Sequence, residues 1–404
     1  MPLQLNSSDR ATLAGAAGPG SALAMRVLVR VAEGMGAGRL LDITGAHVDG
    51  CLYHGQAGLD FARRLNQGGA RVRVPTTLNV GSLDLLHPEL VRMRDPAPAR
   101  ELMDLYVAMG CRATWTCAPY QSEVRPGMGE QIAWAESNAI VFANSVLGAR
   151  TERYGDFIDI CAAVTGRAPA VGLHLDDGRR PRLVLDFGVV RDCFADEVGY
   201  ALAGYVVGRI ADNRVAWLRG LPASTSEDQL KALGAAAASS GAVGLFHAEG
   251  LTPEAASLRP DPATPVVQVD AATLEQARRS LNTTSASGVD AIALGTPHYS
   301  LDQMQRLGDM FKGRQSRVPF YVNTSREVLD RLGEAALARL SASRVTVVTD
   351  TCTYITPILD PSLRVVMTDS VKWAYYAPTN LGVEVVFGSV GECVDAALAK
   401  RAKR

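Results

Sequence analysis

The chain has 404 residues, of which 47% are apolar and 21% are charged, and its formal net charge is −1 at pH 7. This composition is ordinary for a soluble globular protein, and the length predicts two or three domains. Because acidic and basic residues almost cancel, the overall charge does not indicate nucleic acid or an acidic membrane surface as a partner.

The sequence also lacks targeting and cross-linking signals. No stretch reaches the roughly 18–20 uninterrupted apolar residues of a membrane helix, and the N-terminal MPLQLNSSDRATLAG does not have the pattern of a secretory signal. We therefore expect a cytoplasmic protein, in which the seven cysteines form no structural disulfides. No CxxC pair occurs, which argues against a zinc ribbon or a ferredoxin-type loop, so cysteines that bind a metal must converge from distant segments.

The first elements in chain order predict an α/β unit. Residues 6–32 indicate one or two helices, broken at Gly18-Pro19-Gly20. The next segments predict a strand, a glycine-rich loop, a helix and a strand, at residues 40–43, 45–58, 59–66 and 71–74. Loops at strand ends hold the sites of such βαβ-like units, and this loop carries His47, Asp49, Cys51, Tyr53 and His54.

The glycine-rich loop is a weak match to a dinucleotide fingerprint, because GAHVDG lacks the GxGxxG order. Ordinary loop hydrogen bonding is an equally good explanation for His47. The following PTTLNVGSLD places small polar residues ahead of an expected helix, where they either cap the helix or bind a carboxylate or phosphate; these are Thr76, Thr77, Asn79 and Ser82.

The stretch from Cys111 to Asp156 is the most informative part of the chain. Cys117 lies between aromatic residues, and residues 130–150 have apolar side chains at three- and four-residue spacing, which predicts a helix. Polar residues interrupt that apolar run, which is costly unless the helix borders a site that uses them; they are Glu130, Glu136, Asn138, Asn144, Ser145 and Arg150.

The rest of the chain alternates between strand and helix patterns, which is typical of parallel sheets with helices on both faces. The proline-rich RPDPATP is the best linker. Ligands of open parallel sheets bind outside the carboxyl ends of the strands. In the last part of the chain, residues with hydroxyl, imidazole, thiol and ammonium groups follow three such strands. The first strand is followed by Thr296, Pro297 and His298, the second by Thr351, Cys352, Thr353 and Tyr354, and the third by Ser370 and Lys372.

These motifs together resemble the aconitase X family, a divergent branch of the aconitase superfamily. They match in order from about residue 40 to about residue 390, and they are DITGAHVDGCLYHGQAGLDF, VPTTLNVGSLD, WTCAPY, GEQIAWAESNAIVFANSVLGARTERYG, AVTGRAP, ALGTPH, DTCTYITP and TDSVKWAYYAP. The resemblance implies aconitase-like α/β/α layers with mostly parallel sheets, an iron–sulfur cluster and dehydration of a hydroxy acid. We divide the chain into an N-terminal α/β domain with the cluster loops (1–170), a middle α/β domain (171–262) and a C-terminal α/β domain (263–404).

The cysteine pattern distinguishes two branches of that family. The archaeal type, which resembles mevalonate 5-phosphate dehydratases, has cluster cysteines at positions matching 117, 296 and 352, whereas this chain has Thr296. Cys51 offers a replacement thiolate, and the pattern with RYGDF is similar to the bacterial type that dehydrates cis-3-hydroxy-L-proline and looks like a [2Fe-2S] protein. The implied ligands are Cys51, Cys117 and Cys352, which leaves one of the usual four ligand positions for substrate or water. The remaining cysteines are expected to pack in helices or strands; they are Cys111, Cys161, Cys193 and Cys393.

The resemblance also implies partners and residue roles. Aconitase-type enzymes complete the site with a small swivelling domain, and no segment here matches that domain. We therefore expect a separate small subunit that forms a heterodimer with this chain. Ser370 activated by Lys372 is the expected base, unless the base comes from that subunit, and His47 and His298 are expected proton carriers. The substrate carboxylate is expected to be held by Thr76, Thr77, Asn79 or Arg150, while Glu130 orients a neighbour.

Simpler roles exist for several of these residues, since Thr76 could only cap a helix, Lys372 could only be a surface charge and Glu130 could only be an acid at a helix N-terminus. Three functions therefore stay open at this point. They are a cis-3-hydroxy-L-proline dehydratase, a mevalonate 5-phosphate dehydratase of the same fold, and a cluster-free binding or regulatory chain.

Overall fold

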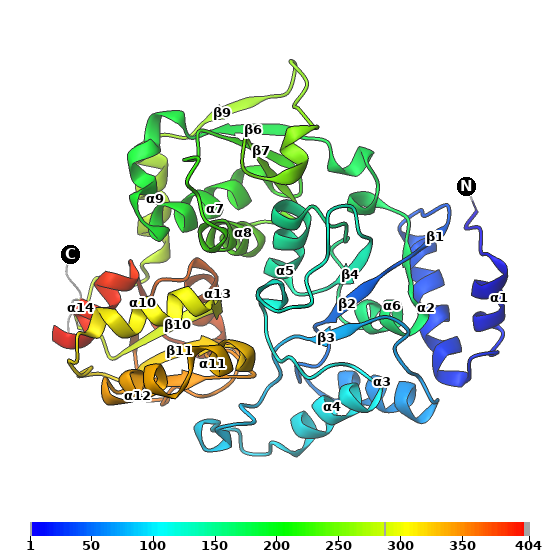
Figure 1. The fold of residues 1–404 in the computed structure, drawn as a ribbon, viewed down its shortest axis with the longest axis horizontal. Helices are drawn as coiled ribbons and strands as arrows, with labels where there is room; N and C mark the ends of the chain where they lie inside the picture. Colours follow the sequence, from blue (N-terminus) through cyan, green and yellow to red (C-terminus); the bar gives the residue numbers. More distant parts are fainter. Residues whose placement is uncertain (1, 287, 400–404) are drawn as a thin grey trace. The chain divides into compact units, whose positions relative to one another are not determined.

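The computed structural model describes residues 2–286 and 288–399. It is an α/β protein whose sheets are mostly parallel, as the sequence predicts (Figure 1). The chain forms two compact units. The first unit contains residues up to Ser82, Arg94–Arg180 and Thr252–Arg259, and the second contains Leu83–Met93, Pro181–Leu251 and the residues from Pro260 onward. The division into three domains stays a prediction.

The first unit is built on a parallel sheet of order β3-β2-β4, with β2 at Gly45–Val48, β3 at Thr76–Leu78 and β4 at Ile132–Trp134. A separate antiparallel pair joins β1 (Leu40–Asp42) to β5 (Arg167–Pro169). Its α-helices are α1 (Ser7–Leu13), α2 (Pro19–Gly34), α3 (Gln56–Gln67), α4 (Ala97–Ala108), α5 (Ser137–Phe142) and α6 (Ile158–Thr165), and a π-helical turn covers Ala143–Leu147.

Three predictions for the first unit are wrong in detail. The predicted loop begins with strand β2, and the strand predicted at 71–74 lies instead at Thr76–Leu78. The predicted helix of residues 130–150 is a strand, a short helix and a π turn, because Ile132–Trp134 pairs in parallel with β2 and only then does Glu136 cap α5. A short, fully buried strand has a continuous apolar run, which periodicity alone cannot distinguish from a buried helix.

The second unit holds two parallel sheets. The first has the order β8-β7-β6-β9, with β6 at Leu183–Asp186, β7 at Ala216–Arg219, β8 at Phe246–Ala248 and β9 at Val266–Gln268. Helices α7 (Glu197–Ala211) and α8 (Glu227–Ser240) pack closely against each other. Strand β9, which follows the proline-rich segment, pairs with β6.

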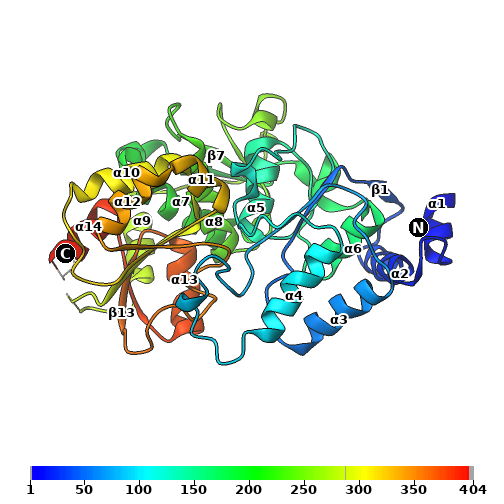
Figure 2. The same cartoon turned by 60° about the horizontal axis from the view of Figure 1, so that its bottom comes forward.

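The other sheet has the order β12-β11-β10-β13-β14 and is parallel throughout. Its strands are β10 (Ala291–Tyr299), β11 (Phe320–Thr324), β12 (Val345–Val348), β13 (Val365–Thr368) and β14 (Glu384–Phe387). Figure 2 shows α10 and α12 on one side of this sheet and α13 on the other. The helices are α9 (Ala271–Leu281), α10 (Leu301–Phe311), α11 (Arg326–Leu332), α12 (Glu334–Ala342), α13 (Val371–Leu381) and α14 (Val390–Ala399).

Apolar side chains of α10, α11, α12 and α14 bury one face of β10 and β11 in a single core. Among the described residues, no helix is long and apolar enough to span a membrane.

Arg179 stabilises the first unit from its interior. The side chain has no exposed surface, and its guanidinium pairs with Glu254 at 2.7 Å. It also donates to Asn144 Oδ1 and to the backbone carbonyls of Leu173, Asn144 and Ala149, at 2.9–3.2 Å. A buried charge is tolerated only when it is paired and hydrogen bonded in this way.

Replacing Arg179 should therefore destabilise the protein strongly. We expect Arg179→Met to lower the free energy of unfolding by about 3–5 kcal/mol, because Glu254 would stay buried with only the longer, 3.8 Å ion pair to Arg150. The matched control is Arg180→Met, whose side chain is 58% exposed, and which should cost less than about 0.5 kcal/mol. Urea denaturation followed by circular dichroism measures both, and equal effects would contradict the assignment.

Candidate active site and iron–sulfur centre

Polar groups of the first unit meet at the carboxyl ends of its parallel strands. Asn79, just after β3, donates a hydrogen bond to the carboxylate of Asp49, just after β2. Burial and the nearby carboxylate of Glu136, which follows β4, raise the pKa of Asp49 to about 7. The parallel arrangement has thus collected one amide and two carboxyl groups at a single edge, as expected for such a sheet.

Cys51 is fully buried at that edge. Its Sγ lies 3.4 Å from the backbone carbonyl oxygen of Asn79 and 3.6 Å from that of Val48. Burial and the carboxyl groups of Asp49 and Asp159 raise the pKa of this thiol well above its ordinary value. A thiolate here would need a cation beside it, because a bound metal reverses the local electrostatic preference.

His47 and Thr77 lie inside the first sheet rather than on loops. His47 Nδ1 and Thr77 Oγ1 share a hydrogen bond of 2.8 Å, and burial lowers the pKa of His47 to about 3. Thr76 Oγ1 donates to the carbonyl of Val74 at 2.8 Å. Thr76 and Thr77 belong to strand β3, so the expectation that they precede a helix is wrong. Their role in binding substrate stays a prediction.

Glu130 and Arg150 lie at the opposite end of the first sheet. Glu130 is exposed, precedes β4 and accepts a hydrogen bond from Thr44, which precedes β2. The side chain of Arg150 pairs with Asp176 at 2.6 Å, and its backbone forms an isolated parallel β-bridge with Gln131, the residue before β4. The structure does not bring these two residues to the edge that holds Asp49, and their role in substrate binding stays a prediction.

The polar residues around α5 have structural partners near Cys117. Glu136 caps α5 by accepting from the backbone N–H of Ala139 at 2.8 Å. Asn138 donates to the carbonyl of Cys117 at 3.0 Å and accepts from the hydroxyl of Tyr120 at 2.6 Å. These contacts hold the loop of Cys117, whose side chain is only 3% exposed.

In the second unit, a bulge at the end of β10 buries the residues of ALGTPH. The pairing register between β10 and β11 shifts between Leu294 and Tyr299. Gly295 has φ +83°, and a Cβ there would collide with the backbone of Asn323, so only glycine fits. The bulge leaves His298 with no exposed surface.

The imidazole of His298 is held in a defined orientation. Its Nε2 donates a hydrogen bond of 3.1 Å to the carbonyl of Thr351. Burial, with the nearby ammonium groups of Lys231 and Lys372, lowers the pKa of His298 to about 4. The ring is therefore neutral at physiological pH.

Cys352 follows β12 on a loop that two neighbouring elements hold. Asn323 on β11 bonds with the backbone N–H and the hydroxyl of Thr353, both at 3.3 Å, and the indole of Trp373 on α13 donates to that hydroxyl at 3.1 Å. The ligand atoms of Cys352 and His298 lie within 4.8 Å of each other, and both residues are buried. The sequence predicts both Cys352 and His298 at the carboxyl ends of this sheet, and the structure brings their side chains together.

Ser370 and Lys372 lie at the start of α13. Ser370 Oγ accepts from the backbone N–H of Trp373 at 3.0 Å, as a helix cap, and donates to the carbonyl of Thr296. Lys372 is 4% exposed and lines a small cavity with Ser370 and Thr296. Lys372 is thus buried and not a surface charge.

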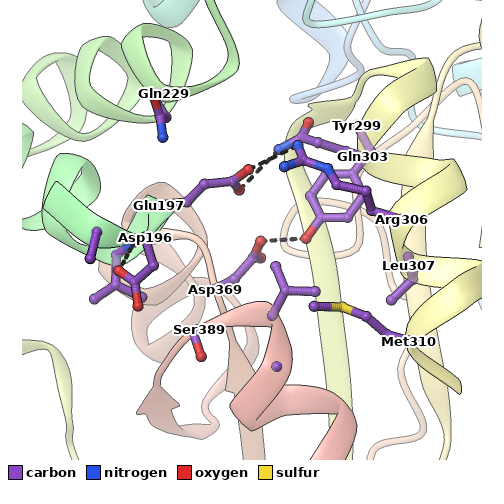
Figure 3. Close-up of a pocket in the computed structure, with 14 residues that line it drawn as sticks. Asp196, Glu197, Gln229, Tyr299, Gln303, Arg306, Leu307, Met310, Asp369 and Ser389 are labelled. Atoms are coloured by element: carbon purple, nitrogen blue, oxygen red, sulfur yellow. Dashed lines mark hydrogen bonds and ion pairs between the residues drawn. The ribbon is translucent and has the colours of Figure 1, made fainter. Parts of the chain in front are cut away.

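A larger cavity of about 390 Å³ lies beside these residues within the second unit (Figure 3). Tyr299 donates a hydrogen bond to Asp369 there, and Arg306 pairs with Glu197 at 3.1 Å. Burial and the carboxylate of Glu197 raise the pKa of Asp369 to about 7. Perturbed carboxyl groups in a cavity are typical of functional sites.

Comparisons with known proteins agree with this geometry. Residues 2–177, 181–279 and 289–399 match the Aconitase X first, second and third domains. The chain belongs to the aconitase X family. It is 42% identical to the cis-3-hydroxy-L-proline dehydratase of Pseudomonas aeruginosa, over 98% of this chain and 70% of that protein. It is 37% identical to the phosphomevalonate dehydratase large subunit of Methanothermobacter thermautotrophicus, over 90% of this chain and 91% of that one.

The fold comparison gives the same family. The crystal structure of Thermococcus kodakaraensis aconitase X in its holo-form matches with a TM-score of 0.88 at 32% sequence identity, and covers 98% of this chain and 100% of that one. The buried thiol and imidazole of Cys352 and His298 fit the iron–sulfur group that the family implies, because soft sulfur and imidazole ligands suit iron.

Sequence reasoning missed two charged residues of this aconitase X chain, Asp369 and Lys231, and placed a third, Asp49, on the glycine-rich loop without giving it a role. Asp369 directly follows β13, so the rule that sites lie at strand ends could have found it. Lys231 lies on α8, where its ammonium contacts Asp228 at 2.8 Å, Gln303 at 2.6 Å and the carbonyl of His298 at 3.4 Å. A single lysine on a helix gives no sequence signal for such a buried position.

The raised pKa of Asp369 predicts a pH dependence of stability. The pKa rises from 3.8 to about 7 on folding, so the folded protein binds this proton more tightly than the unfolded chain does. Proton binding therefore stabilises the folded state at low pH, and this contribution is lost as the pH rises through about 7. Asp369→Asn cannot ionise. We therefore expect its free energy of unfolding, relative to that of the wild type, to increase by on the order of 2 kcal/mol when the pH is raised from 5 to 8. Urea denaturation at both pH values measures this gain, and Asp309→Asn, an exposed residue on α10, is the control. An unchanged difference between variant and wild type would contradict the prediction.

Proposed function

We propose that this aconitase X chain is an iron–sulfur-dependent dehydratase that removes water from cis-3-hydroxy-L-proline and forms a pyrroline-2-carboxylate. Sequence similarity carries this proposal. The identity is 42% and 40% to cis-3-hydroxy-L-proline dehydratases of Pseudomonas aeruginosa and Hypocrea jecorina, against 32–37% to the archaeal phosphomevalonate dehydratase large subunits. Each of these relatives is a dehydratase, so the chain is a hydro-lyase under either assignment.

The charges of the first unit favour the amino acid substrate. The carboxyl groups of Asp49 and Glu136 and the amide of Asn79 lie just after the carboxyl ends of the strands β2, β4 and β3. Carboxylates attract the ammonium group of an amino acid and repel a phosphate dianion. Thr296, where the archaeal type has a cysteine, favours the same substrate.

We assign a [2Fe-2S] cluster to the thiolates of Cys51, Cys117 and Cys352, each of which is buried. When bound, such a cluster supplies a Lewis acid for the hydroxyl at C3 of the substrate. The burial of each of these thiols supports the assignment, because exclusion of water strengthens the electrostatic interactions of a site.

The elimination moves one proton and one hydroxyl group. The C2 proton is transferred to a base and the electrons of the C2–H bond form the C2=C3 double bond. The C3–O bond breaks with its electron pair on oxygen, and the departing hydroxide takes up one proton and leaves as water. We assign the base to Ser370, with the ammonium of Lys372 beside it to stabilise the alkoxide. To act as the base, the Ser370 hydroxyl must release its hydrogen bond to the carbonyl of Thr296. The alternative is a base supplied by a partner subunit. Thr76, Thr77 and Asn79 are assigned to the substrate carboxylate, and His47 is assigned as a proton carrier.

We also propose that a small swivel-domain subunit completes the enzyme as a heterodimer. The archaeal relatives that support this are named large subunits, and this chain aligns with 91–99% of their length. Among the groups that such a subunit could supply is the base.

The substrate assignment predicts a selective activity. Protein purified without oxygen, with and without the neighbouring small-subunit gene product, should release the pyrroline product from cis-3-hydroxy-L-proline and leave mevalonate 5-phosphate unchanged. An iron chelator should abolish the activity, because the leaving hydroxyl loses its Lewis acid. Product detection by mass spectrometry measures both reactions.

Two outcomes would contradict this assignment. If the protein removes water only from mevalonate 5-phosphate, its substrate is the phosphorylated hydroxy acid and not the amino acid. A colourless, iron-free and inactive protein, despite cluster reconstitution and the small subunit, would indicate a cluster-free binding or regulatory chain.

A further inference from the structure

We propose that the cavity lined by α7, α10 and the start of α14 binds a small amine, whose ammonium group is held by Asp369 and Glu197 and whose apolar body packs against α10. Every residue that lines this cavity belongs to the second unit. The proposal goes beyond the dehydratase function, because it requires neither iron nor turnover.

The cavity has the size and the lining of a small-molecule site. Its volume of about 390 Å³ lies within the range of roughly 300–1,000 Å³ that is usual for such pockets. Figure 3 shows Leu307 and Met310 along α10, with the carboxyl groups of Glu197 and Asp369 beside them. A ligand with an apolar body and one charged group therefore matches both parts of the lining.

The charges that line the cavity favour a cation. Among the described residues, three carboxyl groups and one guanidinium line it; they are those of Asp196, Glu197, Asp369 and Arg306. Arg306 already pairs with Glu197 at 3.1 Å, and its side chain is 59% exposed. The neighbouring ammonium of Lys231 pairs with Asp228 at 2.8 Å. The excess of carboxyl groups attracts an ammonium group and repels an anion.

Two helices begin at the cavity, but their N-termini do not make it an anion site. The carboxylate of Asp196 accepts from the backbone N–H groups of Val198 and Gly199 at the start of α7, at 3.0 and 3.3 Å. At the start of α14, Ser389 Oγ accepts from the backbone N–H of Glu392 at 3.1 Å. Because side chains of the protein already cap these helices, the donors that would bind an anion are in use.

Asp369 offers one oxygen atom to a ligand. Its Oδ2 accepts from the hydroxyl of Tyr299, whereas its Oδ1 is buried and has no hydrogen-bond partner on another described residue. A buried polar atom without a partner is costly, and an ammonium group supplies both a donor and a compensating charge. Glu197 is close enough to raise the pKa of Asp369, so the same ammonium group also interacts favourably with Glu197.

An NMR titration of the wild-type protein with cyclohexylammonium tests the proposal. At pH 8, which is above the pKa of about 7 of Asp369, this probe should bind saturably. It should bind about 10–100-fold more tightly than cyclohexanol, which has a similar shape and no charge, because hydrogen bonds between charged groups are stronger than neutral ones. Butylammonium, a slimmer amine, is the second probe.

Substitutions locate the bound amine. Asp369→Asn should weaken the binding of cyclohexylammonium by about 10–100-fold. Glu197→Gln should weaken it by a smaller factor, because Glu197 is already paired with Arg306. The matched control is Asp309→Asn, an exposed residue on α10 that does not line the cavity, and it should leave the affinity unchanged.

The outcomes separate this proposal from the dehydratase function. Equal affinities for cyclohexylammonium and cyclohexanol would overturn it, and so would the absence of saturable binding of both amines. Unchanged binding in Asp369→Asn, with binding lost in Asp49→Asn instead, would place the amine in the first unit and overturn it as well. The comparison of amine and alcohol in the wild-type protein decides the question even if a variant fails to fold. None of these results alters the assignment of the reaction, because the titration depends on neither iron nor turnover.

Discussion

Parallel hydrogen bonding between β10 and its neighbours β11 and β13 is the constraint on which the chemistry of the second unit depends. Because these strands run in one direction, the segments that follow them leave from the same edge of the sheet. The glycine bulge in β10 then turns His298 into the interior, where the loop after β12 brings Cys352. Two residues more than fifty positions apart in the sequence become neighbours for this reason.

Buried polar groups are satisfied differently in the two units. In the first unit, many of them stabilise the backbone, since Glu136 caps a helix, Asn138 holds the loop of Cys117 and Arg179 pairs with Glu254. In the second unit, Asn323 and Trp373 orient the loop that carries a thiol. The same requirement for hydrogen-bond partners thus supports the fold in one place and a reactive group in another.

The sequence predicted the fold class and most helices, because strand and helix patterns alternate clearly and caps such as Asn6 and Ser226 mark helix starts. It did not predict that Ile132–Trp134 is a strand, because a buried apolar run has no decisive period. It selected Cys352 and His298, which the structure brings together, since both follow strand patterns. It also selected Glu130 and Arg150, which lie at the other edge, because residue type alone does not show at which end of a strand a side chain lies. Lys231 was missed for lack of any local signal.

The central claim is that thiols from distant segments hold an iron–sulfur group in this aconitase X chain. The most direct test is the iron content and visible absorption of Cys352→Ser, purified without oxygen beside Cys393→Ser, in which an equally buried thiol lies on α14. We predict that Cys352→Ser loses most of its iron and the charge-transfer absorption, and that Cys393→Ser retains both. Full iron and an unchanged spectrum in Cys352→Ser would contradict the account.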